Sequence, residues 1–389
     1  MTTATLPAAG LWRDNKRYWW LLGSVAAAFP LIGYAGHLAF GGVLWWWFSP
    51  IVVYAVFPLL DYLVGEDNSN PPEERVDSLM KEGYYRLAVM LAIPVQLTTF
   101  VWGSWMWVHG GLGGWELAGL LLSVGMVSGL AINTAHELGH QTDPLERFLA
   151  KLSLAPGAYG HFYVEHNRGH HIRVATPEDP ATSRFGESFY EFFPRCVIGS
   201  FRSAWQIEQR RLQREGKSVW HWSNDNLQAW AMTVAIWGGL LAWLGWTVLP
   251  FLVLQAVYGG SLLEVVNYLE HYGLCRQKKA DGRYERCQPH HSWNSNHVIT
   301  NVFLYHLQRH SDHHANPTRS YQALRDFSDV PRLPSGYSAM ILLAYFPPLW
   351  FKVMNPRVVA HFGGDMRQAN IKPSIREQVI ARYSPAASA

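Results

Sequence analysis

The chain has 389 residues, of which 49% are hydrophobic and 14% aromatic, while only 16% are charged. Soluble proteins carry about 25% charged residues, so this composition excludes an ordinary soluble enzyme, and its apolar content excludes a disordered chain. The formal net charge of +3 is too small to indicate a nucleic-acid-binding protein.

Six apolar stretches are long enough to cross a membrane, because a spanning helix needs about 20 mostly apolar residues. In chain order they are 18–40, 44–64, 87–108, 114–135, 228–247 and 249–270. Short connections join them into three hairpins. We therefore expect an all-α, polytopic membrane protein with six transmembrane helices.

The basic residues indicate how these helices are oriented. Three long segments contain no lysine or arginine, namely 18–74, 87–146 and 218–275. Because these segments hold every expected span, all 32 basic residues fall on one side of a six-helix arrangement, together with both termini. The positive-inside rule makes that side cytoplasmic.

This topology divides the chain into a bundle and cytoplasmic parts. They are an N-terminus at 1–17, a six-helix bundle at 18–271 with a cytoplasmic insertion at about 137–227, a cytoplasmic tail at 272–383, and a flexible, linker-like end at 384–389. An apolar stretch at 337–351 contains two prolines and is too short to span comfortably, so we expect an interfacial or re-entrant segment there. Within the fourth span, Gly125 and Gly129 form a GxxxG pair, which predicts close helix packing.

The candidate metal-binding residues are concentrated in four histidine-rich groups. They are HELGH at 136–140, EHNRGHH at 165–171, NYLEH at 267–271 and HSDHH at 310–314. Residues four apart share a face of an α-helix, so each pair with that spacing is expected to direct two imidazoles at one point. These pairs are His136 with His140, His166 with His170, and His310 with His314.

Adjacent histidines behave differently, because their directions diverge by about 100° on a helix. The two such pairs are His170–His171 and His313–His314, and we expect each pair to serve two different metal centres. The candidate metal ligands are His136, His140, His166, His170, His171, His271, His310, His313 and His314. They exceed the four to six ligands that one transition-metal ion takes, so they predict two metal ions with four or five imidazoles each. The predicted site lies at the cytoplasmic ends of the helices, with the tail completing it as part of a helical, histidine-rich cap.

Each histidine group also carries a carboxylate next to a candidate ligand. These are Glu137, Glu165, Glu270 and Asp312. A helical neighbour points away from the ligand face, so we expect these groups to accept ring N–H bonds and offset the metal charge without binding the metal; solvated loop carboxylates are the alternative. Glu264 and Asn267 share a helical face with His271 near the end of the sixth span, where an acidic residue indicates a functional site.

Two other classes of protein also use histidine-rich metal sites in membranes. HELGH also matches the H-E-x-x-H pattern of zinc metalloproteases, in which the glutamate is the general base. A catalytic zinc takes three protein ligands, which leaves the other histidine groups without a role. A metal transporter would place its ligands near the middle of the membrane, whereas these lie at helix ends.

The four histidine groups resemble those of the alkane 1-monooxygenases (the AlkB family) of bacterial inner membranes. The resemblance extends to GEDNSNPPEE at 65–74, ATPEDPATSR at 175–184 and PHHSWNSNH at 289–297. Membrane fatty-acyl desaturases and related di-iron hydroxylases share the histidine boxes but usually lack the sequence NYLEHYG, so they are the second interpretation.

The resemblance implies a non-haem di-iron enzyme that inserts one oxygen atom of O2 into the terminal C–H bond of a medium-chain n-alkane. The product would be a primary alcohol, the second oxygen atom would leave as water, and rubredoxin would supply the electrons. The nine candidate histidines would hold the two irons. The enzyme would lie in the bacterial inner membrane with its active site on the cytoplasmic side.

Substrate recognition must rest on shape and apolar burial, because an alkane offers no charge or hydrogen bond. Val53, Tyr54 and Phe57 on the second span are candidate walls of a substrate channel; simple helix packing is the alternative for each. The alkane would enter from membrane lipid, into which it partitions.

The electron donor must come from outside this sequence. The three cysteines form no CxxC pair, so rubredoxin is expected as a separate protein or as a domain joined beyond the C-terminal end. A basic cluster is expected either to dock an acidic partner or to bind anionic lipid. It consists of Arg276, Lys278, Lys279, Arg283 and Arg286.

Overall fold

The computed structural model describes residues 12–384, in which α-helices and short 3-10 and π-helices are joined by turns and loops. Within that range no β-strand forms, and the only β-type pairings are four isolated bridges. The predicted all-α fold is confirmed. Most of the predicted linker-like end and residues 1–11 of the predicted N-terminus lie outside the described range.

Five helical segments in the described range are long and apolar enough to cross a membrane. They are Val43–Val64, Gly83–His109, Gly114–Gly139, Asp225–Leu244 and Trp246–His271. Their elements are η1 (Val43–Trp47), α3 (Phe48–Ile51), η2 (Val52–Val56), α4 (Phe57–Val64), α6 (Gly83–Met90), α7 (Ala92–His109), α8 (Gly114–Gly139), α13 (Asp225–Leu244), η4 (Trp246–Val248) and α14 (Leu249–His271). These segments correspond to the second through sixth predicted spans.

The first predicted span, 18–40, is not one continuous helix. It consists of α1 (Leu21–Ala26) and α2 (Phe29–Phe40), which a turn at residues 27–28 separates. Pro30 lies in the first turn of α2. Proline is tolerated there because the first N–H groups of a helix have no intrahelical acceptor, so a new helix begins at this point.

The apolar stretch of the tail forms a sharply bent pair of helices. These are α17 (Tyr337–Ala344) and α18 (Pro347–His361), which meet at 119°. Such a pair is a broken span or a re-entrant segment, and counting it as one span brings the number of candidate spans in the described range to six.

The GxxxG pair packs α8 closely against α14, as predicted. A Cβ atom on Gly125 would lie 2.8 Å from the Tyr258 ring, and one on Gly129 would lie 3.0 Å from Leu262. Small residues at such a crossing let the two backbones approach. The contact brings together the two helices whose ends carry His136 and His271.

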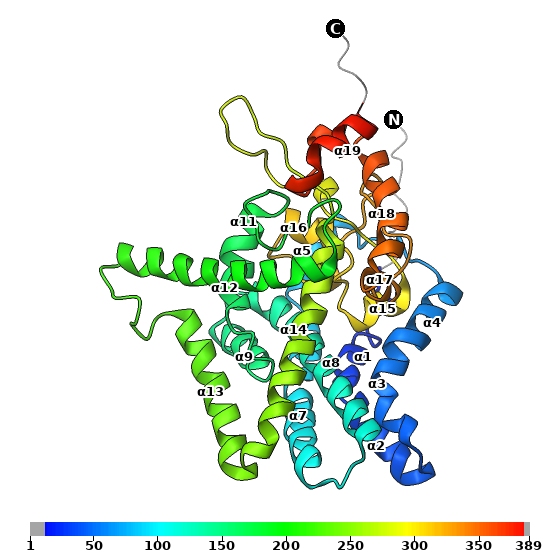
Figure 1. Cartoon of the computed structure of the whole chain (residues 1–389), viewed down its shortest axis with the longest axis vertical. Coiled ribbons are helices and arrows are strands. Elements are labelled where there is room, and N and C mark those ends of the chain that lie inside the picture. Colours follow the sequence, from blue (N-terminus) through cyan, green and yellow to red (C-terminus); the bar gives the residue numbers. More distant parts are fainter. Residues whose placement is uncertain (1–11, 385–389) are drawn as a thin grey trace, which may run out of the picture.

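The insertion and the tail fold together at one end of the bundle, where α12 crosses the ends of α13 and α14 (Figure 1). Their helices are α9 (Pro144–Leu154), α10 (Phe162–Glu165), η3 (His166–His170), α11 (His171–Arg173), α12 (Phe189–Arg214), η5 (Pro289–His291), α15 (Val298–Phe303), α16 (His310–Ala315), η6 (Tyr321–Ala323), η7 (Met366–Gln368), η8 (Pro373–Ile375) and α19 (Arg376–Tyr383). The loop between the second and third spans adds α5 (Glu73–Met80).

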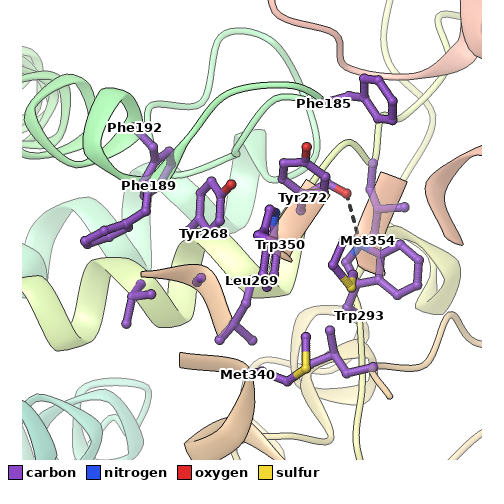
Figure 2. Close-up of a cluster of buried hydrophobic side chains, with 14 of the residues drawn as sticks. Phe185, Phe189, Phe192, Tyr268, Leu269, Tyr272, Trp293, Met340, Trp350 and Met354 are labelled. Atoms are coloured by element: carbon purple, nitrogen blue, oxygen red, sulfur yellow. Dashed lines mark hydrogen bonds between the residues drawn. The ribbon is translucent and has the colours of Figure 1, made fainter. Parts of the chain in front are cut away.

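A buried aromatic cluster fixes the end of α14 against the tail (Figure 2). The rings of Tyr268 and Tyr272 pack against Trp350 of α18, with centroids 5.0 and 5.3 Å apart. The Trp293 indole donates a hydrogen bond to the Tyr272 carbonyl over 3.0 Å. Because each large aromatic side chain buries about 150–250 Å², this cluster holds the neighbouring His271 in a defined position.

Candidate metal centre

Nine histidine rings meet at the capped end of the bundle in two adjacent groups. The five-histidine group consists of His136, His140, His166, His171 and His313, and the four-histidine group of His170, His271, His310 and His314. The ligand atoms within each group lie within 4.8 Å of one another. The groups adjoin, since the ring centroids of His171 and His314 are 4.5 Å apart. The structure thus brings together all nine candidate ligands.

Helix geometry explains how α8 and α16 contribute their rings. His136 lies on α8 and His140 is the C-cap residue of the same helix, four residues later, and the two join the same group. His310 and His314 do so on α16, as predicted. His313, which is adjacent to His314, falls in the other group, also as predicted. On these helices the period of the α-helix therefore decides which group a ring joins.

The prediction for the third pair is wrong, because His166 and His170 lie in different groups. His166 shares the five-histidine group with His171 instead. The reason is local: residues 166–170 form a π-helix, η3, whose hydrogen bonds join residues five apart. A π-helical turn places residues five apart on one side, so His171 follows His166 and His170 turns to the second group.

The distances between ring nitrogens fit bound cations. Nε2 of His166 lies 3.1 Å from that of His140 and 3.0 Å from that of His171. A neutral ring nitrogen carries either one proton or one lone pair, so it cannot satisfy both contacts with full hydrogen bonds. A metal ion surrounded by Nε2 atoms satisfies all of them, and an imidazole donor set suits zinc, iron, copper and nickel.

Burial keeps the rings ready to bind metal. It lowers the pKa values of His166, His171, His310, His313 and His314 well below the ordinary value of 6.5, and repulsion from neighbouring rings lowers them further. A histidine must be unprotonated at the nitrogen that binds a metal. These five rings are therefore neutral at neutral pH.

A buried carboxylate holds one ligand ring from behind. Nδ1 of His170 lies 2.9 Å from Oδ2 of Asp179, which also accepts a hydrogen bond from the Thr182 hydroxyl over 2.6 Å. Burial opposes ionisation of Asp179, but His170 and Thr182 outweigh it and hold the pKa of this carboxyl below its usual value. The contact places the ring proton of His170 on Nδ1 and leaves an unprotonated Nε2 facing the other rings of its group, as a metal ligand requires.

Two of the carboxylates predicted beside the ligands have other partners. Glu137 accepts a hydrogen bond from the backbone N–H of Tyr321 over 3.2 Å. Glu165 forms an ion pair with Arg173. Burial raises the pKa of Glu165 to about 7, although Arg173 opposes the shift.

Asp312 and Glu264 tie segments of the site together. Asp312 forms an ion pair with Arg319 over 2.8 Å. Glu264 accepts a 2.6 Å hydrogen bond from the Tyr159 hydroxyl and a 3.3 Å bond from Nδ2 of Asn267. These contacts fix the segments that carry the ligands.

Glu270 alone among the four predicted carboxylates lies at a ligand nitrogen. Its Oε2 atom is 3.1 Å from Nε2 of His310, and its Oε1 atom accepts a 2.8 Å hydrogen bond from the Tyr337 hydroxyl.

An apolar cavity of about 80 Å³ leads to the rings. Of the predicted channel residues, Val53 and Phe57 line it, whereas the Tyr54 hydroxyl lies 2.9 Å from that of Tyr258. His136, His166, Asn267, Glu270 and His310 also line it. A molecule in this cavity would contact both hydrocarbon side chains and candidate ligand histidines.

The amino-acid sequence of this chain is similar to those of proteins with known functions. The fatty acid desaturase family model matches residues 113–344. Alkane 1-monooxygenase of Pseudomonas putida is 47% identical over 383 residues, which cover 98% of this chain and 95% of that protein. Alkane 1-monooxygenase 1 of Alcanivorax borkumensis is 48% identical over 364 residues, or 94% of this chain and 90% of that protein. This chain belongs to the alkane 1-monooxygenase family. The family resemblance inferred from the histidine groups is confirmed, and membership makes the chain a monooxygenase with a metal centre.

Asp179 is a site residue of this alkane 1-monooxygenase family member that sequence reasoning did not single out. It lies in ATPEDPATSR, eight residues after His171. The motif forms part of the family resemblance, but an irregular loop has no periodicity from which to predict the histidine that Asp179 contacts. Only the folded loop returns Asp179 to His170.

The basic cluster is divided between the surface and the interior. Its exposed members are Lys278, Lys279, Arg283 and Arg286. Arg276 is only 8% exposed, and its guanidinium donates hydrogen bonds to the backbone carbonyls of Ile172 and Glu285. The expectation that Arg276 belongs to a docking surface is therefore wrong, because this side chain satisfies buried carbonyl groups.

Proposed function

We propose that this chain hydroxylates the terminal carbon of medium-chain n-alkanes to primary alcohols, with O2, two non-haem irons and electrons from rubredoxin. The observation that carries the proposal is the apolar cavity that His136, His166 and His310 help to line. Its shape and chemistry suit a substrate without polar groups whose reacting end must reach a metal centre. The names of the related alkane 1-monooxygenases support the same substrate class.

The overall reaction is RH + O2 + 2 H+ + 2 e− → ROH + H2O. One oxygen atom enters the terminal C–H bond and the other leaves as water, while the two electrons come from the donor one at a time. The irons, held by the nine histidines, would supply the binding and reduction of O2, which amino-acid side chains cannot perform.

The chain's own residues bind and orient the alkane. Each CH2 group that leaves water for an apolar site gains about 0.8 kcal/mol, so the cavity walls supply binding energy that grows with chain length. Because an alkane offers no polar group, the shape of the cavity must decide which carbon meets the ligands. Asp179 keeps the His170 ring fixed while substrate binds.

We place the metal centre on the cytoplasmic side of a bacterial inner membrane, with both termini on that side. The loop at residues 273–288, α16 and α19 lie at the same end of the molecule, opposite the α7–α8 and α13–α14 connections (Figure 1). This end carries the exposed basic residues of the loop, as the positive-inside rule requires of a cytoplasmic face. The same surface offers an acidic electron donor such as rubredoxin a complementary charge.

The position of Glu137 argues against a zinc protease. In an H-E-x-x-H protease the glutamate serves as general base beside a zinc-bound water. Here Glu137 accepts a hydrogen bond from the Tyr321 backbone. His136 and His140 also share their group with three further histidines, more than a catalytic zinc takes.

Metal analysis and turnover by the detergent-purified protein test the proposal. We expect about two irons per chain and conversion of octane to 1-octanol with reduced rubredoxin. His310→Ala should lose metal and turnover, whereas His109→Ala, on an exposed residue far from the site, should keep both. A single zinc with peptidase activity, or desaturation of an acyl chain, would contradict the proposal.

A further inference from the structure

The carboxyl of Glu270 has an unusual environment at the end of α14. It is 1% exposed, and its Oε1 atom accepts the hydrogen bond from Tyr337. The other oxygen, Oε2, lies 3.1 Å from Nε2 of His310. Glu270 and His310 both line the apolar cavity. One oxygen is thus held from behind while the other faces the ligand nitrogens.

The His310 nitrogen beside Glu270 is the one that faces the centre of its group. Nε2 of His310 lies 2.8 Å from Nε2 of His314 and 3.3 Å from that of His271. A nitrogen that binds a metal carries no proton, so it cannot donate a hydrogen bond to Glu270. Two electron-rich atoms would then face each other at 3.1 Å. A cation that both atoms bind removes this conflict.

We propose that Glu270 is a tenth ligand, which binds the metal ion of the four-histidine group through Oε2. The inference rests on the proposed two-metal function. Four imidazoles leave room in a shell of about four to six ligands, and the group beside Glu270 is the one with fewer histidines. A dication also provides the positive partner that a fully buried carboxylate needs.

The proposed role differs from that of Asp179. Asp179 contacts Nδ1 of His170, on the far side of the ring from the metal, and so orients a ligand. Glu270 contacts the Nε2 side of His310 and so lies where a ligand atom lies. Tyr337 holds Oε1, which leaves a single oxygen for the metal.

Glu270→Gln tests the assignment, because it keeps the shape of the side chain and removes the charge. The matched control is Glu137→Gln: Glu137 also lies next to a candidate ligand, but its carboxyl contacts the Tyr321 backbone. We would measure metal per chain and Mössbauer spectra of isotopically enriched iron in the detergent-purified full chain, before turnover. In Glu270→Gln we expect metal to fall from about two ions per chain toward about one, or the signal of one site alone to shift. Glu137→Gln should match the wild type.

Tyr337→Phe provides a second variant if Glu270→Gln fails to fold. It keeps the carboxylate but removes the hydrogen bond to Oε1, so we expect two metals with the signal of one site shifted and a metal affinity about tenfold weaker at that site. The assignment is overturned if the wild type holds two metals and the folded variants keep both with unchanged spectra. A wild type that binds fewer than two metals would instead overturn the proposed function.

Discussion

Asp179→Asn is a sharp test of how the surroundings of a ligand ring control metal binding. The substitution keeps the size of the side chain and an oxygen that can accept the Nδ1 proton of His170, but it removes the negative charge. Asp179 is 1% exposed, and its other partners are the Thr182 hydroxyl and the backbone N–H of Ala181, so the loop can persist.

The expected loss follows from the geometry. A hydrogen bond to a charged group contributes about 1.5–3 kcal/mol, and loss of a carboxylate that supports a metal-bound histidine lowers metal affinity about 10–100-fold. A 10–100-fold change corresponds to about 1.4–2.7 kcal/mol, so the two figures agree. The loss should fall on the four-histidine group, to which His170 belongs.

Competition with a chromophoric chelator measures this effect. Asp179→Asn should release one class of metal at a chelator concentration about 10–100-fold lower than the wild type requires, while the other class stays unchanged. Asp61→Asn is the matched control, because Asp61 is equally buried and also binds a threonine hydroxyl, that of Thr300, but contacts no ligand ring. Equal weakening of both classes, or none, would refute the reasoning.

Three further results should follow. Val53→Phe should raise the ratio of octane to decane turnover, because Val53 lines the cavity and a larger side chain there favours shorter alkanes. Tyr54→Phe, at a residue whose hydroxyl contacts Tyr258, should leave this ratio unchanged. An unaltered ratio in Val53→Phe would contradict the assigned cavity. The unfolding temperature of the metal-free protein should fall as the pH drops from about 7 to about 5, because buried rings with lowered pKa values gain protons only on unfolding. Each such ring lowers the free energy of unfolding by up to about 1.4 kcal/mol per pH unit. These rings are His166, His171, His310, His313 and His314, and a flat profile of thermal unfolding against pH would count against their burial. Reversing the charge of the four exposed basic residues should raise the KM for rubredoxin at low salt without changing the KM for octane, and an unchanged KM for both would remove the docking surface.

Sequence patterns were enough to predict the helical membrane architecture and to single out the nine histidines that the fold gathers. Apolar length is sufficient to identify a spanning helix, because lipid leaves few alternatives for an apolar segment of about 20 residues. Histidines concentrated at helix ends likewise indicated a metal centre, since so many imidazoles exceed what one metal ion binds. The α-helical period also assigned the rings of α8 and α16 correctly.

Local departures from regular helices and contacts between distant segments could not be predicted from the sequence patterns and became visible in the fold. Because residues 166–170 form a π-helix, His171 and not His170 joins the group of His166. A turn divides the first predicted span into α1 and α2. The loop that returns Asp179 to His170 and the burial of Arg276 follow no sequence period. The physical reason is that a periodic pattern reports which face of a regular helix is apolar, whereas side-chain partners depend on how packed segments meet in space.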